Sequence, residues 1–333
     1  MKTSSKIMFF TMLITSTFMV MSASSWMTMW MGLEINLMSF IPLISTSKNL
    51  FLSQGVMMYF LVQSMSSLMF LLTILMYKYM FLYMNTYLNK IIITMLMMMK
   101  MGMPPFHFWF PEISNKLSWN SCMMLMTWQK MAPMYIMSLM MELNKIMSLM
   151  ICLSALMGAI GGLNQTSTRK IMAYSSMNHL SWMTMCAMTF KKSWTLYLFM
   201  YFIMMISISW MMKMYNILYI NQMNIFFEKN IDKIIMMMMM LSLGGIPPFL
   251  GFLPKWITIQ YMVTSKEFIT MVIMMMSALI TLNYYLRITT NMNLMMSHSQ
   301  KWMKSISTKK NMSVYMMITN LLFPLMILIM NFY

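Results

Sequence analysis

Charged residues are scarce in this sequence. Of its 333 residues only 9% are charged, 60% are apolar, and the mean hydropathy is +0.67. A soluble domain carries about 25% charged residues, and a soluble core this apolar would leave too little polar surface to stay in solution. The composition therefore excludes an ordinary soluble protein and predicts a chain that uses lipid as its solvent.

Ligands for metals and cofactors are also few. The three cysteines and three histidines are scattered, so they indicate no disulfide framework, zinc site or paired haem ligands. No GxGxxG or GxxxxGK[ST] motif is present, which argues against a nucleotide site. We therefore expect no metal and no cofactor in this chain.

Methionine and positive charge are abundant instead. Thioethers can bind soft metals, but the 64 methionines are spread over every apolar run, which favours a flexible apolar filler. The net charge of +17 could suggest nucleic acid. Because the basic residues are dispersed between apolar runs, we expect them to set membrane topology and predict no nucleic-acid partner.

Eleven apolar runs approach the roughly 20 residues that a bilayer span requires. Fourteen of the 23 lysines and arginines then fall on the side of the N-terminus and six on the other, so the N-terminal side is predicted to be the positive, inner face. The first run could also be a signal peptide, but the span count favours a retained helix. The runs are 7–23, 26–46, 56–77, 88–110, 119–140, 146–163, 171–190, 194–215, 234–260, 268–288 and 313–332.

Six of the nine prolines lie in two segments, 102–111 and 245–254, that share the pattern GxPPFxxxxP. Tandem prolines remove backbone donors and clash with the preceding turn, so each segment is predicted to break its helix. Two unrelated proline kinks are the simpler alternative, but they do not explain the shared pattern. The glycines and tandem prolines of the predicted breaks are Gly102, Pro104, Pro105, Gly245, Pro247 and Pro248.

These segments fall in runs four and nine, which cross the bilayer in opposite directions. The pattern predicts an all-α polytopic membrane protein with two inverted five-helix repeats, each containing a broken helix, and one C-terminal helix. Such repeats are typical of transporters that hold an ion site near the midplane. The predicted domains are 1–145 for the first repeat, 146–290 for the second, 291–312 for a basic loop and 313–333 for the last span.

One carboxylate and three lysines lie inside the predicted spans: Glu34, Lys100, Lys130 and Lys255. Each costs roughly 2.5–3.5 kcal/mol if unpaired, so we expect them to be paired or reached by water. A lysine suits a proton relay because its affinity for a proton changes with burial and with a nearby carboxylate. Snorkelling to the headgroups is the alternative. We predict a relay in which Glu34 faces Lys100, directly or through one water, and Lys130 joins this pair to Lys255.

His179 lies in run seven, the repeat partner of the run that holds Glu34. It is a candidate for a corresponding relay position, and a neutral, hydrogen-bonded core histidine is the alternative. His107, in the first predicted break, has the same two interpretations.

Over roughly residues 1–290, the order and spacing of several motifs resemble one family, subunit 2 of animal mitochondrial NADH-ubiquinone oxidoreductase (complex I), which is antiporter-like. The tail from Asn291 carries little of the resemblance. The matching motifs are Gly32 to Asn36, Lys100 to His107, Thr127 to Lys130, Gly161 to Thr166, Arg169 to Ser176 and Gly251 to Trp256.

The resemblance implies a proton-translocating subunit of the mitochondrial inner membrane, with the N-terminus in the matrix and the C-terminus in the intermembrane space. In this family, partner subunits carry the flavin and iron–sulfur clusters that move electrons from NADH to ubiquinone. Expected partners are other complex I membrane and accessory subunits and lipids that include cardiolipin. Glu34 and Lys100 match the family's Glu–Lys pair, Lys130 its connecting lysine, and Lys255 the lysine of the second broken helix.

Three other functions remain open. A free-standing cation/proton antiporter would share the fold and the relay. A structural membrane subunit would not require charges inside its spans, and a redox subunit would require cofactor ligands that the sequence lacks.

Overall fold

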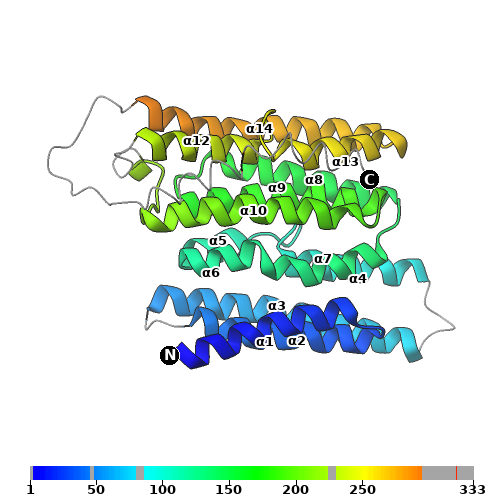
Figure 1. Ribbon diagram of the computed structural model, residues 1–333. Coiled ribbons are helices and arrows are strands. Elements are labelled where there is room, and N and C mark those ends of the chain that lie inside the picture. Colours follow the sequence, from blue (N-terminus) through cyan, green and yellow to red (C-terminus); the bar gives the residue numbers. More distant parts are fainter. Residues whose placement is uncertain (1–2, 46–48, 80–85, 224–229, 295–319, 321–333) are drawn as a thin grey trace. The chain divides into compact units, whose positions relative to one another are not determined.

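The computed structural model describes residues 3–45, 49–79, 86–223, 230–294 and Asn320. Regular structure in these residues is helical (Figure 1), apart from one isolated bridge between Ser167 and Tyr219. The chain divides into two compact units, Met1–Met150 and Ile151–Tyr333.

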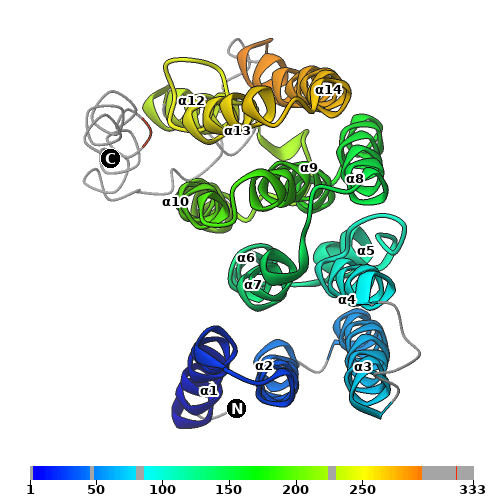
Figure 2. The ribbon, with the colours of Figure 1, turned by 90° about the vertical axis from the view of Figure 1, so that its right-hand side faces the viewer.

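In the first unit, α1 packs on α2, α2 on α3, and α3 on both α4 and α5. Viewed along the helices in Figure 2, α6 and α7 share one axis, so together with the 3-10 turn η1 they form one interrupted helix. The elements are α1 (Thr3–Ser22), α2 (Trp26–Ile44), α3 (Leu50–Tyr79), α4 (Thr86–Met101), α5 (Trp109–Lys116), α6 (Trp119–Met126), η1 (Trp128–Lys130) and α7 (Met131–Met140).

In the second unit, α9 packs on α10, α13 and α14, and α12 packs on α10 and α14. Helix α8 leads the chain into this unit. Its elements are α8 (Lys145–Leu163), α9 (Thr168–Thr189), α10 (Ser193–Met214), α12 (Asn230–Gly244), α13 (Phe252–Thr264) and α14 (Phe268–Leu294).

Large apolar side chains are exposed on the helices and at one helix break. Leu50 is 81% exposed, Ile269 78% and Phe108 73%. Such surfaces are rare on soluble monomers and are expected where lipid surrounds the protein. Within the described residues, six helices are long and apolar enough to cross a membrane: α1, α2, α3, α8, α10 and α14.

The other predicted spans with described coordinates correspond to α9 and to three interrupted helices, α4–α5, α6–η1–α7 and α12–α13. The total of eleven spans stays a prediction. The run 313–332 (apart from Asn320) and the basic segment from 295 onward lie outside the described residues.

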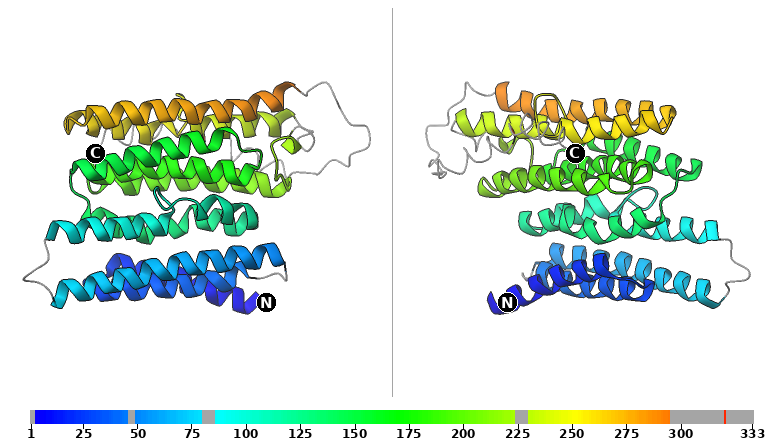
Figure 3. Two further views of the ribbon diagram at one scale, coloured as in Figure 1. Left: turned by 180° about the vertical axis from the view of Figure 1, so that it is seen from behind. Right: turned by 45° about the vertical axis from the view of Figure 1, so that its right-hand side comes forward.

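Both GxPPF segments interrupt a helix. Helix α4 ends at Met101 and α12 at Gly244, and each is followed by a glycine with positive φ, 73° at Gly102 and 76° at Gly245. Met103 N donates to Met98 O (2.9 Å) and Ile246 N to Leu241 O (3.4 Å), which is the six-to-one bond of a Schellman cap. The two breaks thus share one local geometry, and Figure 3 shows the first of them at mid-length of the neighbouring helices. The inverted relation between the two repeats stays a prediction.

Candidate functional site

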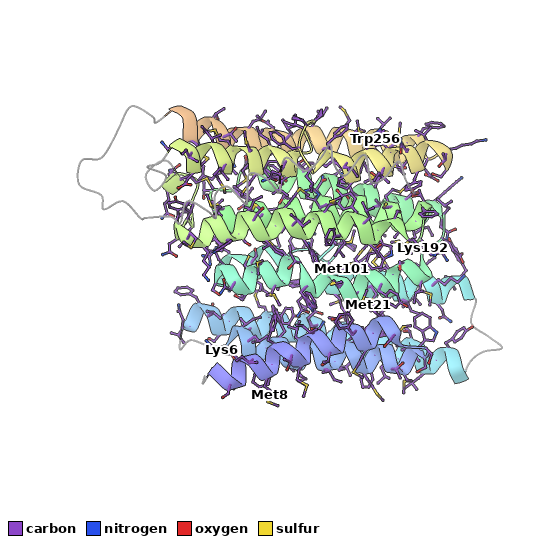
Figure 4. All side chains as sticks on the ribbon, viewed as in Figure 1. Lys6, Met8, Met21, Met101, Lys192 and Trp256 are labelled. Atoms are coloured by element: carbon purple, nitrogen blue, oxygen red, sulfur yellow. The ribbon has the colours of Figure 1, made fainter. Side chains whose placement is uncertain are left out.

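The first break places two lysines inside the first unit. Lys100 stands one residue before the end of α4 and is 6% exposed, and Lys130 ends η1 and is 2% exposed. Figure 4 labels Met101, the neighbour of Lys100, at mid-length of the unit's helices. Both side chains are therefore buried inside the unit, where the helices are interrupted.

These two lysines line the same cavity. Its volume is about 20 Å³, and one water molecule needs about 10–15 Å³ and two or more polar partners. The cavity meets both requirements, so it can hold a single water that both lysines line. The polar side chains that line it are Asn36, Tyr59, Gln63, Lys100, Gln129 and Lys130.

Neutral polar groups fix the geometry of this cavity. Gln63 Nε2 donates to the carbonyl oxygen of Lys100 (2.9 Å), one of the carbonyls that the break leaves without a helical partner. Gln129 Nε2 donates to Asn36 Oδ1 (3.0 Å), and Tyr59 OH donates to Gln129 Oε1 (3.4 Å). The amide network therefore connects α2, α3 and η1 around the lysines.

An aromatic ring forms one wall beside Lys130. Its Nζ lies 5.2 Å from the centroid of the Phe110 ring, within range of a cation–π interaction. Phe110 in turn packs on Gly102, where an added Cβ would lie 2.6 Å from Phe110 Cβ. Gly102 is therefore needed both for its positive φ and for this close approach.

Glu34 lies on α2, is half-buried, and interacts electrostatically with Lys100. Within the described residues the two side chains do not form a direct ion pair. Direct contact between Glu34 and Lys100 is therefore absent, and their contact through one water stays a prediction. Gly32 lets α1 approach this part of α2, since an added Cβ would lie 2.6 Å from Val20 Cγ2.

Lys255 occupies the second break. It lies on α13, is 6% exposed, and its Nζ donates to the carbonyl oxygen of Gly244 (2.8 Å), the last residue of α12. The C-terminal end of a helix carries a partial negative charge, which stabilises a cation there. The lysine thus caps the helix that the GxPPF segment interrupts.

His179 is buried on α9 and surrounded by tyrosines. Its Nδ1 lies 3.0 Å from Tyr197 OH, and its ring centroid is 5.2 Å from that of Tyr201. His107, in the first break, is 5% exposed. The structure therefore brings Lys100 and Lys130 together in one unit and places Lys255 and His179 in the other.

Two buried charges were missed by the sequence analysis. The predicted span began at 234, whereas α12 begins at Asn230. Asp232 (2% exposed) and Lys233 (6% exposed), which precede the predicted span, therefore lie in the first turn of that helix. Tyr215 OH donates to Asp232 Oδ2 (2.5 Å). An acidic residue within the first turn is a common helix-start signal and would have indicated the earlier boundary.

Among the described residues, no three His, Cys, Asp or Glu side chains gather as a metal site would require. What the arrangement offers instead is a set of buried groups that can gain and lose protons. Two lysine amines line a cavity together with side-chain amides, and the imidazole of His179 lies beside a tyrosine hydroxyl.

Residues 23–281 match the family described as NADH:quinone oxidoreductase/Mrp antiporter, transmembrane. Curated relatives named NADH-ubiquinone oxidoreductase chain 2 include one from Locusta migratoria, 40% identical over 92% of this chain and 91% of the relative. The relative from Anopheles gambiae is 41% identical over 96% and 95%, and that from Bos taurus 35% over 86% and 85%.

Two solved structures share the fold. A chain of respiratory complex I from Thermus thermophilus gives a TM-score of 0.81 at 17% identity, covering 96% of this chain and 78% of that one. A chain of the Mrp complex from a Dietzia species gives 0.75 at 15% identity, with coverage of 84% and 59%. On the family match and the similarity to the curated relatives, the chain belongs to the antiporter-like NADH-ubiquinone oxidoreductase chain 2 family, whose animal members are multi-pass proteins of the mitochondrial inner membrane.

Proposed function

We propose that this protein translocates protons as a core membrane subunit of respiratory complex I, driven by electron transfer from NADH to ubiquinone in partner subunits. The observation that carries the proposal is the cavity of about 20 Å³ shared by Lys100 and Lys130. Burying two lysines in a membrane protein is energetically costly. Such residues commonly mark ion or proton pathways. A cavity that can hold one water between them allows a proton to pass from one to the other.

Transfer in the first unit would use the lysines in opposite protonation states. The ammonium of one lysine gives a proton to the water, and the water gives a proton to the neutral amine of the other. The charge moves while the number of protons in the cavity stays constant. A carboxylate favours the charged form of a nearby lysine, so a change in the interaction between Glu34 and Lys100 would send the proton toward Lys130.

In the second unit the proposed station is Lys255. Its ammonium is held by the Gly244 carbonyl at the end of α12, and it must leave that carbonyl to release a proton. Protons must cross about 30 Å of hydrocarbon, which no single side chain can span. The proposed route therefore runs from Lys130 to Lys255, with His179 as a further station.

The partners proposed are other complex I membrane and accessory subunits and lipids including cardiolipin, with the flavin and iron–sulfur clusters in those partner subunits. A free-standing cation/proton antiporter is the second candidate, because the Mrp complex chain shares the fold. The similarity to curated oxidoreductase chains favours the first. Copurification with flavin and iron–sulfur subunits would distinguish the two.

The Lys130→Met substitution tests the relay. It keeps the side-chain volume and removes the proton-binding amine from the cavity. A positioned proton carrier contributes about 10²–10⁴-fold to a transfer step, so we expect NADH-driven pumping to fall on the order of tenfold or more. Electron transfer from NADH to artificial acceptors should stay near the wild-type rate. Both are measured on the assembled complex in sealed membrane vesicles.

Lys192→Met provides the control, because Lys192 is exposed between α9 and α10. It removes one positive charge without touching the cavity and should pump normally. Full pumping by an intact Lys130→Met complex would exclude this route.

The predicted sidedness can be tested on the basic segment 291–312, most of which lies outside the described residues. It contains Lys301, Lys304, Lys309 and Lys310, and basic segments next to a span resist translocation. We expect a protease or an amine-reactive label to reach it from the matrix side only. Modification from the intermembrane-space side alone would reverse the proposed orientation.

A further inference from the structure

Four tyrosines are buried inside the second unit. Tyr197 and Tyr201 come from α10 and Tyr284 and Tyr285 from α14, and none is more than 1% exposed. Phenylalanine would fill the same space without a hydroxyl to desolvate, and desolvating a hydroxyl is unfavourable unless the group finds a hydrogen-bond partner. Four hydroxyls in one apolar interior therefore point to a use for them.

One end of this cluster meets His179. The hydroxyl of Tyr197 lies 3.0 Å from His179 Nδ1, so a proton can move directly between the two. The Tyr201 ring lies against the imidazole, with the centroids 5.2 Å apart. A proton on the tyrosine cluster can therefore reach His179 through the Tyr197 hydroxyl.

The other end meets the residue that holds Lys255. A Cβ added to Gly244 would lie 3.7 Å from Tyr285 Cδ2, so the Tyr285 ring packs on Gly244. The carbonyl of this same glycine accepts the hydrogen bond from Lys255 Nζ (2.8 Å). Tyr285 and Lys255 therefore approach one point of the chain from two helices.

The middle of the cluster contains hydroxyls that are suited to water. The Tyr284 and Tyr285 rings are 4.7 Å apart, and the Tyr285 hydroxyl lies beside the hydroxyls of Ser175 and Tyr284 and interacts electrostatically with Tyr197. Neither the Tyr284 nor the Tyr285 hydroxyl has a hydrogen-bond partner of normal geometry among the described residues. Buried polar groups of this kind commonly bind ordered water.

The Gly161-Gly162 motif makes room for this arrangement. An added Cβ at Gly162 would lie 2.8 Å from Tyr284 Cε1, and one at Gly161 would lie 2.3 Å from Tyr174 Cε1. The two glycines of α8 thus leave room for two tyrosine rings, Tyr174 and Tyr284. The lysines of the proposed relay do not by themselves require this space.

We propose that Tyr285 and Tyr197, with ordered water between them, conduct protons between Lys255 and His179. This inference rests on the proposed function. The Lys255 ammonium gives one proton to the chain, and each hydroxyl accepts a proton at its oxygen as it releases its own. Both tyrosines stay neutral, and the neutral imidazole of His179 takes up the last proton. Only O–H and N–H bonds change, and no electron is transferred.

Tyr285→Phe and Tyr197→Phe in the assembled complex test the proposal. Each removes one oxygen and keeps the ring. A positioned proton carrier contributes about 10²–10⁴-fold to its step, so we expect pumping to fall on the order of tenfold or more, while electron transfer to artificial acceptors is unchanged. The Tyr285→Phe complex should be as stable to heat as the wild type or more so, because among the described residues the buried hydroxyl that it loses makes no hydrogen bond of normal geometry. If the hydroxyl were purely structural, its removal would leave pumping unchanged and would lower the heat stability of the complex.

Tyr261→Phe is the matched control. Tyr261 is half-buried on α13 and stacks on Phe190 with the ring centroids 5.2 Å apart, outside the proposed chain. Full pumping by both cluster variants, with pumping lost in Lys255→Met, would overturn this inference and leave the proposed function standing. Normal pumping in Lys255→Met would instead remove the proposed function. If a variant fails to assemble, an experimental structure of the wild-type complex decides, since ordered water on the Tyr285 hydroxyl is expected and a dry contact would refute the chain.

Discussion

Replacement of Lys255 by methionine is expected to stop proton pumping while the redox reactions of the complex continue. The ammonium of Lys255 is the cation that the structure places at the second helix break, where its Nζ donates to Gly244 O at 2.8 Å. Methionine keeps the volume but neither binds a proton nor caps the carbonyl. Because a positioned proton carrier contributes about 10²–10⁴-fold to its step, the pumping rate should fall by about two orders of magnitude. NADH-driven acidification by membrane vesicles measures this directly.

The Lys255→Arg substitution separates the two roles of this residue. Arginine can still donate to the Gly244 carbonyl, but it does not lose its proton in proteins. We expect the Arg complex to assemble well and pump poorly. The Met complex, which leaves a buried carbonyl without its donor, should also lose about 1–3 kcal/mol of stability. Normal pumping in the Arg variant would show that Lys255 acts only as a helix cap.

The Gly251→Ala substitution is expected to prevent the second unit from folding. An added Cβ would lie only 1.8 Å from the backbone oxygen of Ser242, and a backbone atom cannot rotate away as a side chain can. The backbone angles of Gly251 (φ −68°, ψ −12°) suit any residue, so close packing alone requires glycine here. Overpacking of a core commonly costs about 1–3 kcal/mol and at times more, and this contact should lie at or above the upper end.

Gly244→Ala is the matched control for that experiment. It is the last residue of α12, and the nearest atom to an added Cβ is 3.7 Å away, which is an ordinary van der Waals contact. We expect the Gly244→Ala protein to assemble at the wild-type level and the Gly251→Ala protein to be absent from the assembled complex on native gels. Equal amounts of both would mean that the start of α13 does not approach Ser242 as closely as the structure indicates.

The two helix breaks share their backbone geometry and differ in the group that satisfies them. At the first, the carbonyl of Lys100 accepts from the neutral amide of Gln63, a residue of another helix. At the second, the carbonyl of Gly244 accepts from the cation Lys255, a residue of the continuing helix. The neutral amide of Gln63 can keep its hydrogen bond to the Lys100 carbonyl whatever the protonation states of the lysines. The Lys255 ammonium, in contrast, can carry a proton away when it leaves the Gly244 carbonyl. In the proposed mechanism, the second break is therefore the one in which helix capping and proton transfer would be coupled.

The amino-acid sequence by itself determined the features that depend on local chemistry. Tandem prolines were enough to place both helix breaks, because two consecutive prolines remove two backbone donors and clash with the preceding turn. A single proline need not break a helix, and Pro42 lies within α2. The scarcity of charge made Lys100, Lys130 and Lys255 stand out, and the structure buries all three. The start of α12 was placed four residues too late, because charged residues at a helix end resemble a loop in an apolar sequence.

Only the tertiary structure decided which of these groups meet. The cavity between Lys100 and Lys130 and the Gln129–Asn36 bond join residues far apart in the chain, and no local pattern records such a contact. The same is true of the tyrosine cluster, since tyrosines on α10 and α14 are individually indistinguishable from ordinary apolar filling. Composition and backbone chemistry act within a few residues, whereas a proton route depends on which side chains the packing of separate helices brings within hydrogen-bond distance.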